Sequence, residues 1–140
     1  IVQLKKFDEV HAIRRSNKER LDSIFQRING LRTIYEMPQA ETSWFGVPLV
    51  CESKKQKRSL VNFLEVNRIQ TRNYFAGNIL LHPAYREIDD FTKYPVANEV
   101  MDRVFFVGCS PTISNEMINY IEVIVDQFIS AAKYQENNKK

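Results

Sequence analysis

Apolar side chains recur at intervals of three and four residues in the first part of the chain. They begin at residues 4–10 and return at 21–28. This spacing places them on one face of an amphipathic helix, or of a broken pair of helices. Asn29-Gly30 follows, and glycine adopts the left-handed conformation at a helix C-terminus at little cost. The pattern therefore predicts a helical segment that ends near residue 30, with a loop around Pro38 after it.

A second, stronger helical stripe lies near the C-terminal end. Ser114 precedes it, and serine is a favoured N-cap because its hydroxyl accepts a hydrogen bond from a free backbone N–H. The apolar positions of the stripe are Met117, Ile118, Ile121, Ile124, Val125, Phe128 and Ile129.

Two runs of aromatic and β-branched residues, 43–51 and 103–109, predict strands. Pro48 cannot donate to a strand ladder, so its strand lies at an edge or turns the proline to a free side. Between the runs, Ser53 is placed to cap a helix that carries Leu60, Val61 and Leu64 and ends at Asn67.

The predicted order is helix, strand, helix, short strand or loop, short helix at 96–102, strand, helix. This order indicates an α+β fold: a small antiparallel or mixed sheet with helices packed on it. The chain of 140 residues fits a single domain, 1–140.

Composition narrows the class of protein. A hydrophobic content of 44% is enough for a core, and the net charge of +3 comes from scattered basic residues, which does not indicate nucleic acid. Cys51 and Cys109 are too few for a disulfide scaffold or zinc site, so we expect buried free thiols and a cytoplasmic location. No apolar run is long enough for a membrane helix, and no signal peptide is visible. The chain opens on Ile1 with a helical pattern under way, which we interpret as a piece of a longer protein.

The segment 68–78 carries the chain's most suggestive chemistry. It reads Arg-Ile-Gln-Thr-Arg-Asn-Tyr-Phe-Ala-Gly-Asn between two apolar segments, as expected for a ligand-facing loop. The guanidinium of Arg72 can bind phosphate or carboxylate in a bidentate way. The alternative is that Arg72 pairs with a structural acid, Glu65 or Asp102, and the sequence alone leaves both open.

Candidates for catalysis are few. His11 lies on the polar side of the first helix, which predicts a surface role, while His82 stands near the Arg72 segment and a ligand contact stays open for it. Trp44 and Phe45 are interpreted as core or interface residues. The chain shows no nucleophile elbow, no phosphate-binding glycine loop and no metal-ligand spacing. We therefore assign no catalytic and no metal-binding residue here.

Several motifs resemble the C-terminal part of the NDP-4-keto-6-deoxyhexose 3-dehydrases. These enzymes belong to the DegT/DnrJ/EryC1/StrS sugar aminotransferase superfamily, whose members have the aspartate-aminotransferase fold (fold type I) and depend on vitamin B6. The resemblance covers nearly all of the chain, and the Phe-Ala-Gly-Asn piece favours the dehydrases over ordinary sugar aminotransferases. The motifs are Arg14-Arg15-Ser16-Asn17, Ser43-Trp44-Phe45-Gly46-Val47-Pro48, Asn67-Arg68-Ile69-Gln70-Thr71-Arg72, Phe75-Ala76-Gly77-Asn78, Pro83-Ala84-Tyr85 and residues 105–111.

The resemblance implies a function. Such enzymes remove the C3 hydroxyl of a CDP- or GDP-linked 4-keto-6-deoxy sugar with pyridoxamine or pyridoxal phosphate, for the dideoxysugars of lipopolysaccharide O-antigen. The chain would be the C-terminal small domain, inactive alone, with a large N-terminal domain as its partner and a homodimer as the full-length state. The large domain would hold most of the cofactor, the histidine that replaces the Schiff-base lysine and, in one branch, a [2Fe–2S] cluster. The implied substrate-binding residues are Arg72, Tyr74, Phe75 and Asn78.

Two alternatives stay open. One is the small domain of a pyridoxal-phosphate-dependent sugar aminotransferase, and the other is a non-catalytic module that binds a nucleotide sugar or a protein. A domain separated from its partner exposes an apolar patch. We expect that patch to include part of the first helix and Trp44-Phe45.

Overall fold

The computed structural model describes residue 2 and residues 4–137. In this part of the chain the α-helices are α1 (Phe7–Phe25), α2 (Lys54–Val66), α3 (Pro95–Arg103) and α4 (Asn115–Asn137). The strands are β1 (Arg32–Thr33), β2 (Gly46–Val50), β3 (Thr71–Asn73) and β4 (Val104–Gly108). Short 3-10 helices lie at Leu4–Lys6, Ile79–Leu81, Pro83–Tyr85 and Phe91–Lys93.

The strands form one antiparallel sheet in the order β1-β2-β4-β3. Residues opposite each other in an antiparallel pair point to the same face, and successive residues alternate between faces. Val47 and Val107 are opposite each other and buried on one face. Phe106, between Phe105 and Val107, therefore lies on the other face with Pro48 and Arg72, which are its partners in β2 and β3.

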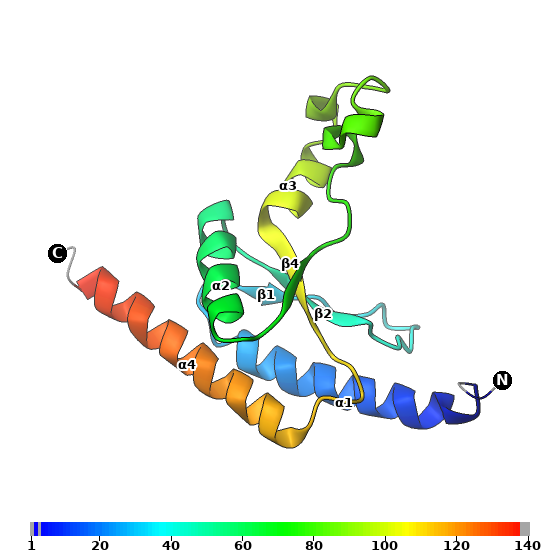
Figure 1. Cartoon of the computed structure of the whole chain (residues 1–140), viewed down its shortest axis with the longest axis vertical. Coiled ribbons are helices and arrows are strands. Elements are labelled where there is room, and N and C mark those ends of the chain that lie inside the picture. The colour runs from blue at the N-terminus through cyan, green and yellow to red at the C-terminus, as the bar shows by residue number, and fades with distance from the viewer. Residues whose placement is uncertain (1, 3, 138–140) are drawn as a thin grey trace.

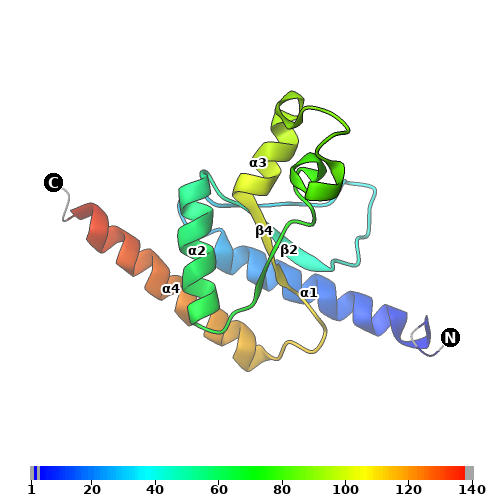
Figure 2. The same ribbon diagram turned by 45° about the horizontal axis from the view of Figure 1, so that its top comes forward.

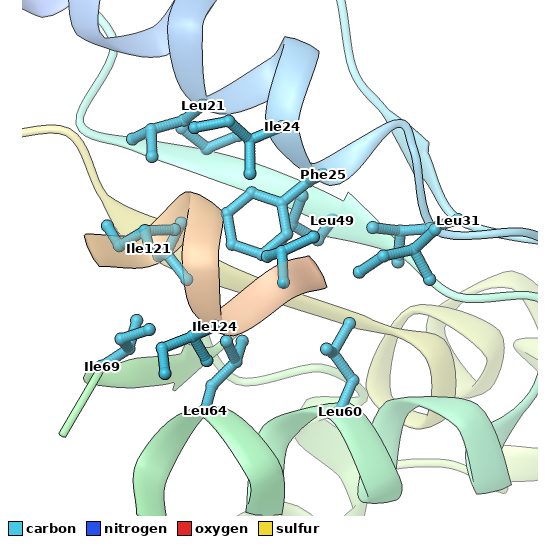
Figure 3. Close-up of a cluster of buried hydrophobic side chains, with 14 of the residues drawn as sticks. Leu21, Ile24, Phe25, Leu31, Leu49, Leu60, Leu64, Ile69, Ile121 and Ile124 are labelled. Atoms are coloured by element: carbon cyan, nitrogen blue, oxygen red, sulfur yellow. The ribbon is translucent and has the colours of Figure 1, made fainter. Parts of the chain in front are cut away.

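The core lies between one face of the sheet and helices α1, α2 and α4. Figure 3 shows Phe25 of α1 beside Leu49 of β2, with Leu60 and Leu64 of α2 and Ile124 of α4 around them. Each fully buried side chain of this size stabilises the fold by roughly 1.5–3 kcal/mol. The helices thus close one face of the sheet and leave the Phe106 face to other contacts.

Both predicted helix caps are present. The Ser53 hydroxyl accepts a hydrogen bond from the backbone N–H of Gln56 at 3.1 Å, and that of Ser114 accepts one from Met117 at 3.3 Å. These local hydrogen bonds explain why the predicted helix starts are confirmed.

The contact between α1 and α4 is extended by Arg27, just after α1. This arginine forms ion pairs with Glu122 and Asp126 of α4.

Of the two placements expected for Pro48, the second is confirmed. Its strand β2 is not at the edge, because it lies between β1 and β4, but Pro48 is on a free side, since β1 pairs only with Leu49 and Val50 and stops before it. One prediction needs correction. Met117 is 56% exposed and does not belong to the core stripe of α4.

Residues 74–103 form an arm that projects away from α1 and α4 (Figures 1 and 2). The arm contains three of the 3-10 helices and α3. Asn78 lies inside the arm and is 2% exposed. Most of its large apolar side chains are uncovered: Phe75, Ile79, Tyr85, Ile88, Phe91, Tyr94 and Val96.

Candidate functional site

Aromatic rings gather around Phe106 on the sheet face that the helices leave free. The ring centroid of Phe106 lies 5.7 Å from that of Phe45, 6.4 Å from that of Tyr74 and 6.0 Å from that of Phe75. These separations are within the usual range for interacting aromatic pairs. We call Phe45, Tyr74, Phe75 and Phe106 the aromatic platform. It joins three segments that are far apart in the sequence: Phe45 before β2, Tyr74 and Phe75 after β3, and Phe106 in β4.

Small residues shape the platform at the paired ends of β2 and β4, where Gly46 is opposite Gly108. A Cβ at Gly46 would lie 2.5 Å from Cδ2 of Phe106 and 2.8 Å from the carbonyl oxygen of Val107. The Phe106 ring therefore occupies the space that a side chain would take. A Cβ at Gly108 would meet nothing within 4 Å, so the surface is open there.

Arg72 stands on the same face as the platform and is exposed. Neither acid that could have neutralised it is paired with it. Glu65 accepts hydrogen bonds from the N–H and hydroxyl of Thr71 at 2.6 and 2.7 Å, and Asp102 pairs with Lys54 at 2.7 Å. Bonding from Thr71, with a smaller attraction from Arg72, lowers the pKa of Glu65. Among the described residues, the guanidinium makes no ion pair and no side-chain hydrogen bond, which leaves its donor fork for a ligand.

The turn after β3 positions Phe75. This residue has φ of 51°, a left-handed conformation that is uncommon for an aromatic residue, and it is 71% exposed. Gly77 follows with φ of 61°, and a Cβ there would lie 2.7 Å from Cβ of Met101. Strained backbone of this kind is often found at binding sites. The turn thus holds the Phe75 ring out beside Tyr74, at a centroid separation of 5.1 Å.

Asn78 is placed differently from the other predicted binding residues. Its amide donates to the carbonyl oxygen of Phe91 at 3.2 Å and to Oδ1 of Asn98 at 2.8 Å, and its own Oδ1 accepts from the N–H of Leu80 at 3.0 Å. With its polar atoms used inside the arm, Asn78 is a structural residue that supports the turn of Phe75. The structure therefore does not bring its side chain to the platform with Arg72, Tyr74 and Phe75.

The two histidines have local roles. Nε2 of His82 lies 3.0 Å from the carbonyl oxygen of Ala76, and the His11 ring stacks on Phe7 at a centroid separation of 5.5 Å. Neither histidine forms an ion pair with a described acid. His82 thus closes the turn that follows Phe75. It lies near the Arg72 segment, as the sequence indicated.

The sequence analysis missed a buried ion pair on α1. Lys18 and Asp22 are 4% and 7% exposed, and Nζ of Lys18 lies 2.5 Å from Oδ2 of Asp22. Burial raises the pKa of Asp22, against the attraction of Lys18. A cavity of about 360 Å³ adjoins the pair, between α1 and the loop of residues 34–45. The only sequence signal was the spacing of four residues between a cation and an anion.

The expected apolar patch is present in part. Phe7 of α1 is 50% exposed and Phe45 is 68% exposed, but Trp44 packs against the core and is half-buried. Self-association through this patch stays a prediction.

The described residues do not make a complete site for a vitamin B6 cofactor. Arg72 is the charged side chain that we place at the platform, and such a cofactor also needs protein groups at its ring nitrogen and reacting carbon. The described residues contain no cluster of His, Cys, Asp and Glu that could hold a metal ion. None of the described helices has the length and hydropathy to span a bilayer.

Comparison with known proteins gives consistent relatives. The chain is 33% identical over 136 residues to dTDP-4-dehydro-2,6-dideoxy-D-glucose 3-dehydratase of Saccharopolyspora spinosa, covering 91% of this chain and 29% of that protein. It is 28% identical over 140 residues to the lipopolysaccharide biosynthesis protein RfbH of Salmonella typhimurium, covering 91% of this chain and 30% of that protein. The chain thus spans less than a third of the length of these curated relatives.

Solved structures agree with the predicted fold. The GDP-4-keto-6-deoxy-D-mannose-3-dehydratase of E. coli, solved with hydrated PLP, matches with a TM-score of 0.74 and 25% identity, over 89% of this chain and 33% of that one. A sugar aminotransferase of Streptococcus pneumoniae, named from its sequence, shares the fold at a TM-score of 0.81 and 19% identity, over 93% of this chain and 33% of that one. The predicted α+β architecture, that of the small domain of fold type I enzymes, is confirmed.

A family model settles the relationship over most of the chain. It is described as the DegT/DnrJ/EryC1/StrS aminotransferase family and matches residues 1–126. The resemblance read from the motifs at residues 43–48 and 67–78 is therefore confirmed. This chain belongs to the DegT/DnrJ/EryC1/StrS aminotransferase family.

Proposed function

We propose that residues 1–140 are the C-terminal small domain of a nucleotide-sugar 3-dehydrase. The enzyme would remove the C3 hydroxyl of a nucleotide-linked 4-keto-6-deoxyhexose during dideoxysugar synthesis for lipopolysaccharide. Its named relatives support this reaction class, because two are 3-dehydratases and a third belongs to lipopolysaccharide biosynthesis. The relatives carry dTDP- and GDP-sugars in their names, so a CDP-sugar as substrate rests on the motif resemblance alone.

The observation that carries the proposal is the open face formed by Arg72 and the aromatic platform. A nucleotide sugar has a diphosphate, which matches the unpaired guanidinium fork, and it has rings that pack on aromatic faces. Arg72 would hold the diphosphate, while Tyr74 and Phe75 would line the sugar. Phe106 is already buried, at 8% exposed, so the substrate would cover the exposed rings of Phe45 and Phe75 beside it. Water excluded there would strengthen the charge contact with Arg72.

The cofactor of the proposed enzyme is pyridoxamine or pyridoxal 5'-phosphate, which supplies an electron sink for the bond changes in the sugar. This chain offers binding and orientation but not the groups that hold the cofactor. We therefore propose that catalysis needs a large N-terminal domain, that the chain alone is inactive, and that the full-length enzyme is a cytoplasmic homodimer. Cys51 and Cys109 are buried in this fold, so an iron–sulfur cluster is proposed only for the large domain, as a property of one branch.

Peptide mapping of the native protein from its source cells tests this proposal. We expect a domain upstream of Ile1, with histidine at the position where the cofactor is linked in aminotransferases. Lysine at that position would make the protein a sugar aminotransferase. A native chain that starts near Ile1 would favour a non-catalytic module that binds a nucleotide sugar or a protein.

A further inference from the structure

The loop of residues 34–45 is closed by a buried cation of α1. Nζ of Lys18 donates to the carbonyl oxygen of Ile34 at 2.9 Å, at the start of the loop. The same atom lies 4.3 Å from the ring centroid of Trp44, near the loop's end. A cation over the face of tryptophan is attracted by the ring quadrupole, more strongly when desolvated. Lys18 therefore fixes both ends of the loop at once.

A second cation of α1 fixes the middle of this loop. Arg15 donates to both carboxylate oxygens of Glu36 at 2.6 and 2.9 Å, and Glu36 accepts from the N–H of Thr42 at 2.7 Å. The loop is thus tied to the helix at its start, middle and end. Such a loop presents its last residue in one defined position.

That last residue is Phe45, and it belongs to the platform. Trp44 packs on the core side, and its carbonyl oxygen accepts a hydrogen bond from the Cys109 thiol at 3.1 Å. Phe45, the next residue, is 68% exposed and contacts Phe106 on the opposite side of the sheet. The anchor of Trp44 therefore sets where the Phe45 ring stands.

The buried ion pair of Lys18 and Asp22 is not explained by a gain in stability alone. The desolvation of Lys18 and Asp22 costs free energy, and an apolar replacement of such a pair is often neutral or stabilising. The pair orients the side chain of Lys18, because Asp22 holds the ammonium group between the carbonyl oxygen of Ile34 and the Trp44 ring.

We propose that Phe45 contacts the sugar nucleotide on the platform, and that Lys18 is a positioning residue that holds Phe45 there through Trp44. This inference rests on the proposed function. It adds a binding residue from the loop of 34–45 to the residues that follow β3.

The first test is the substitution Phe45→Ala in the intact enzyme, with GDP-4-keto-6-deoxy-D-mannose and dTDP-4-dehydro-2,6-dideoxy-D-glucose as the substrates assayed. Loss of one aromatic contact should raise KM for the better substrate by about three- to tenfold and leave kcat within about twofold. Met37→Ala is the matched control, since Met37 is an exposed apolar residue of the same loop, at 71%. An unchanged KM for Phe45→Ala overturns the inference.

The second test is a double-mutant cycle on the positioning role. Lys18→Met combined with Asp22→Leu removes both charges, so no unpaired buried charge is left to unfold the protein. This variant should raise KM about as much as Phe45→Ala does, and it should add nothing further in the Phe45→Ala background. Arg20→Gln is the control, because Arg20 lies on α1 but bonds Asn115 at 2.6 Å and not the loop. Thermal melting checks that each variant is folded.

The outcomes separate this inference from the proposed function. If the combined variant raises KM by the product of the two separate increases, Lys18 acts independently of Phe45. That result would overturn its positioning role. If Arg72→Ala raises KM and Phe45→Ala does not, only this inference fails. If neither substitution changes KM, the platform is not the substrate site and the proposed function fails with it.

Discussion

Arg72 in β3 and Phe106 in β4 are direct partners across an antiparallel ladder, so a free guanidinium and an aromatic ring share one face of the sheet. Directly opposite side chains in such a ladder are close enough to act on one ligand. The opposite face of the same strands is filled by the core. The sheet therefore separates a packed side, which stabilises the domain, from a side suited to binding.

Replacement of Arg72 by alanine should weaken substrate use in the intact enzyme. Loss of charge-assisted hydrogen bonds costs about 1.5–3 kcal/mol, which corresponds to roughly a 10- to 150-fold fall in kcat/KM. The kcat/KM of Arg72→Lys should lie between those of the unchanged enzyme and of Arg72→Ala, because lysine keeps the charge and loses the forked donor geometry. Arg58→Ala, an exposed arginine of α2, serves as the control. Unchanged steady-state kinetics of Arg72→Ala would remove this residue from the site.

Asn78→Ala should loosen the arm. The side chain is 2% exposed and makes three hydrogen bonds within the arm. Leaving their partners unsatisfied costs about 2 kcal/mol, so amide hydrogen exchange across residues 79–94 should accelerate roughly 30-fold. The exposed Asn62→Ala serves as the matched change on α2. If Asn78→Ala leaves amide exchange in the arm slow but weakens substrate binding, Asn78 contacts the ligand directly.

Gly46 and Gly108 are partners in the sheet, but substitution by alanine should destabilise the protein at Gly46 and have little effect at Gly108. Gly46→Ala forces the Phe106 ring or the Val107 carbonyl to move, and overpacking of this kind costs about 1–3 kcal/mol. Gly108→Ala enters open space, and its effect should stay within about 0.5 kcal/mol. Urea unfolding of both variants measures the difference, and equal midpoints would contradict the proposed crowding at Gly46.

The pattern of apolar residues predicted much of the fold, and the reasons are local. α2 and α4 carry their own periodic stripes and serine caps, so neither needs distant contacts to be recognised. β1 has two residues, too few for any periodicity. The buried state of Lys18 arises because Trp44 and Ile34 close over it from another segment, which no local pattern reports.

The sequence predicted part of the candidate site and missed the part that depends on contacts between distant segments. Arg72, Tyr74 and Phe75 lie in one polar and aromatic segment, and the structure brings them to one face. Phe45 had been interpreted as a core or interface residue, because its neighbourhood with Phe106 depends on the β2–β4 register. The hydrogen bonds from the Asn78 amide to Asn98 and Phe91 were not predictable, because those residues lie 13 to 20 positions further along the chain. A contact of Asn78 with the substrate stays a prediction.

Acid should release the clamp between Arg15 and Glu36. The bond from Arg15, with that from the Thr42 N–H, lowers the pKa of Glu36 from 4.5 to about 2. A lowered pKa means that the folded state favours the charged carboxylate. The clamp's contribution to stability is therefore complete above pH 4.5 and is lost as the pH falls through about 2.

An NMR titration of the Glu36 carboxyl carbon measures this pKa directly. Arg15→Ala should move the pKa back toward 4.5, because the largest cause of its lowering is removed. Glu9→Gln, an exposed change on the same helix, should leave the titration of Glu36 as it is. A Glu36 pKa near 4.5 in the unmodified protein would show that the loop is not clamped.

The central claim is that this chain serves a 3-dehydrase, and the product of the intact enzyme tests it most directly. The enzyme, supplied with pyridoxamine phosphate and GDP-4-keto-6-deoxy-D-mannose or dTDP-4-dehydro-2,6-dideoxy-D-glucose, is followed by mass spectrometry and NMR of the sugar. We predict a sugar that has lost its oxygen at C3, formed roughly 10- to 150-fold more slowly by Arg72→Ala at low substrate concentration. A sugar that keeps the C3 hydroxyl and gains an amino group at C4 would contradict the account and identify an aminotransferase.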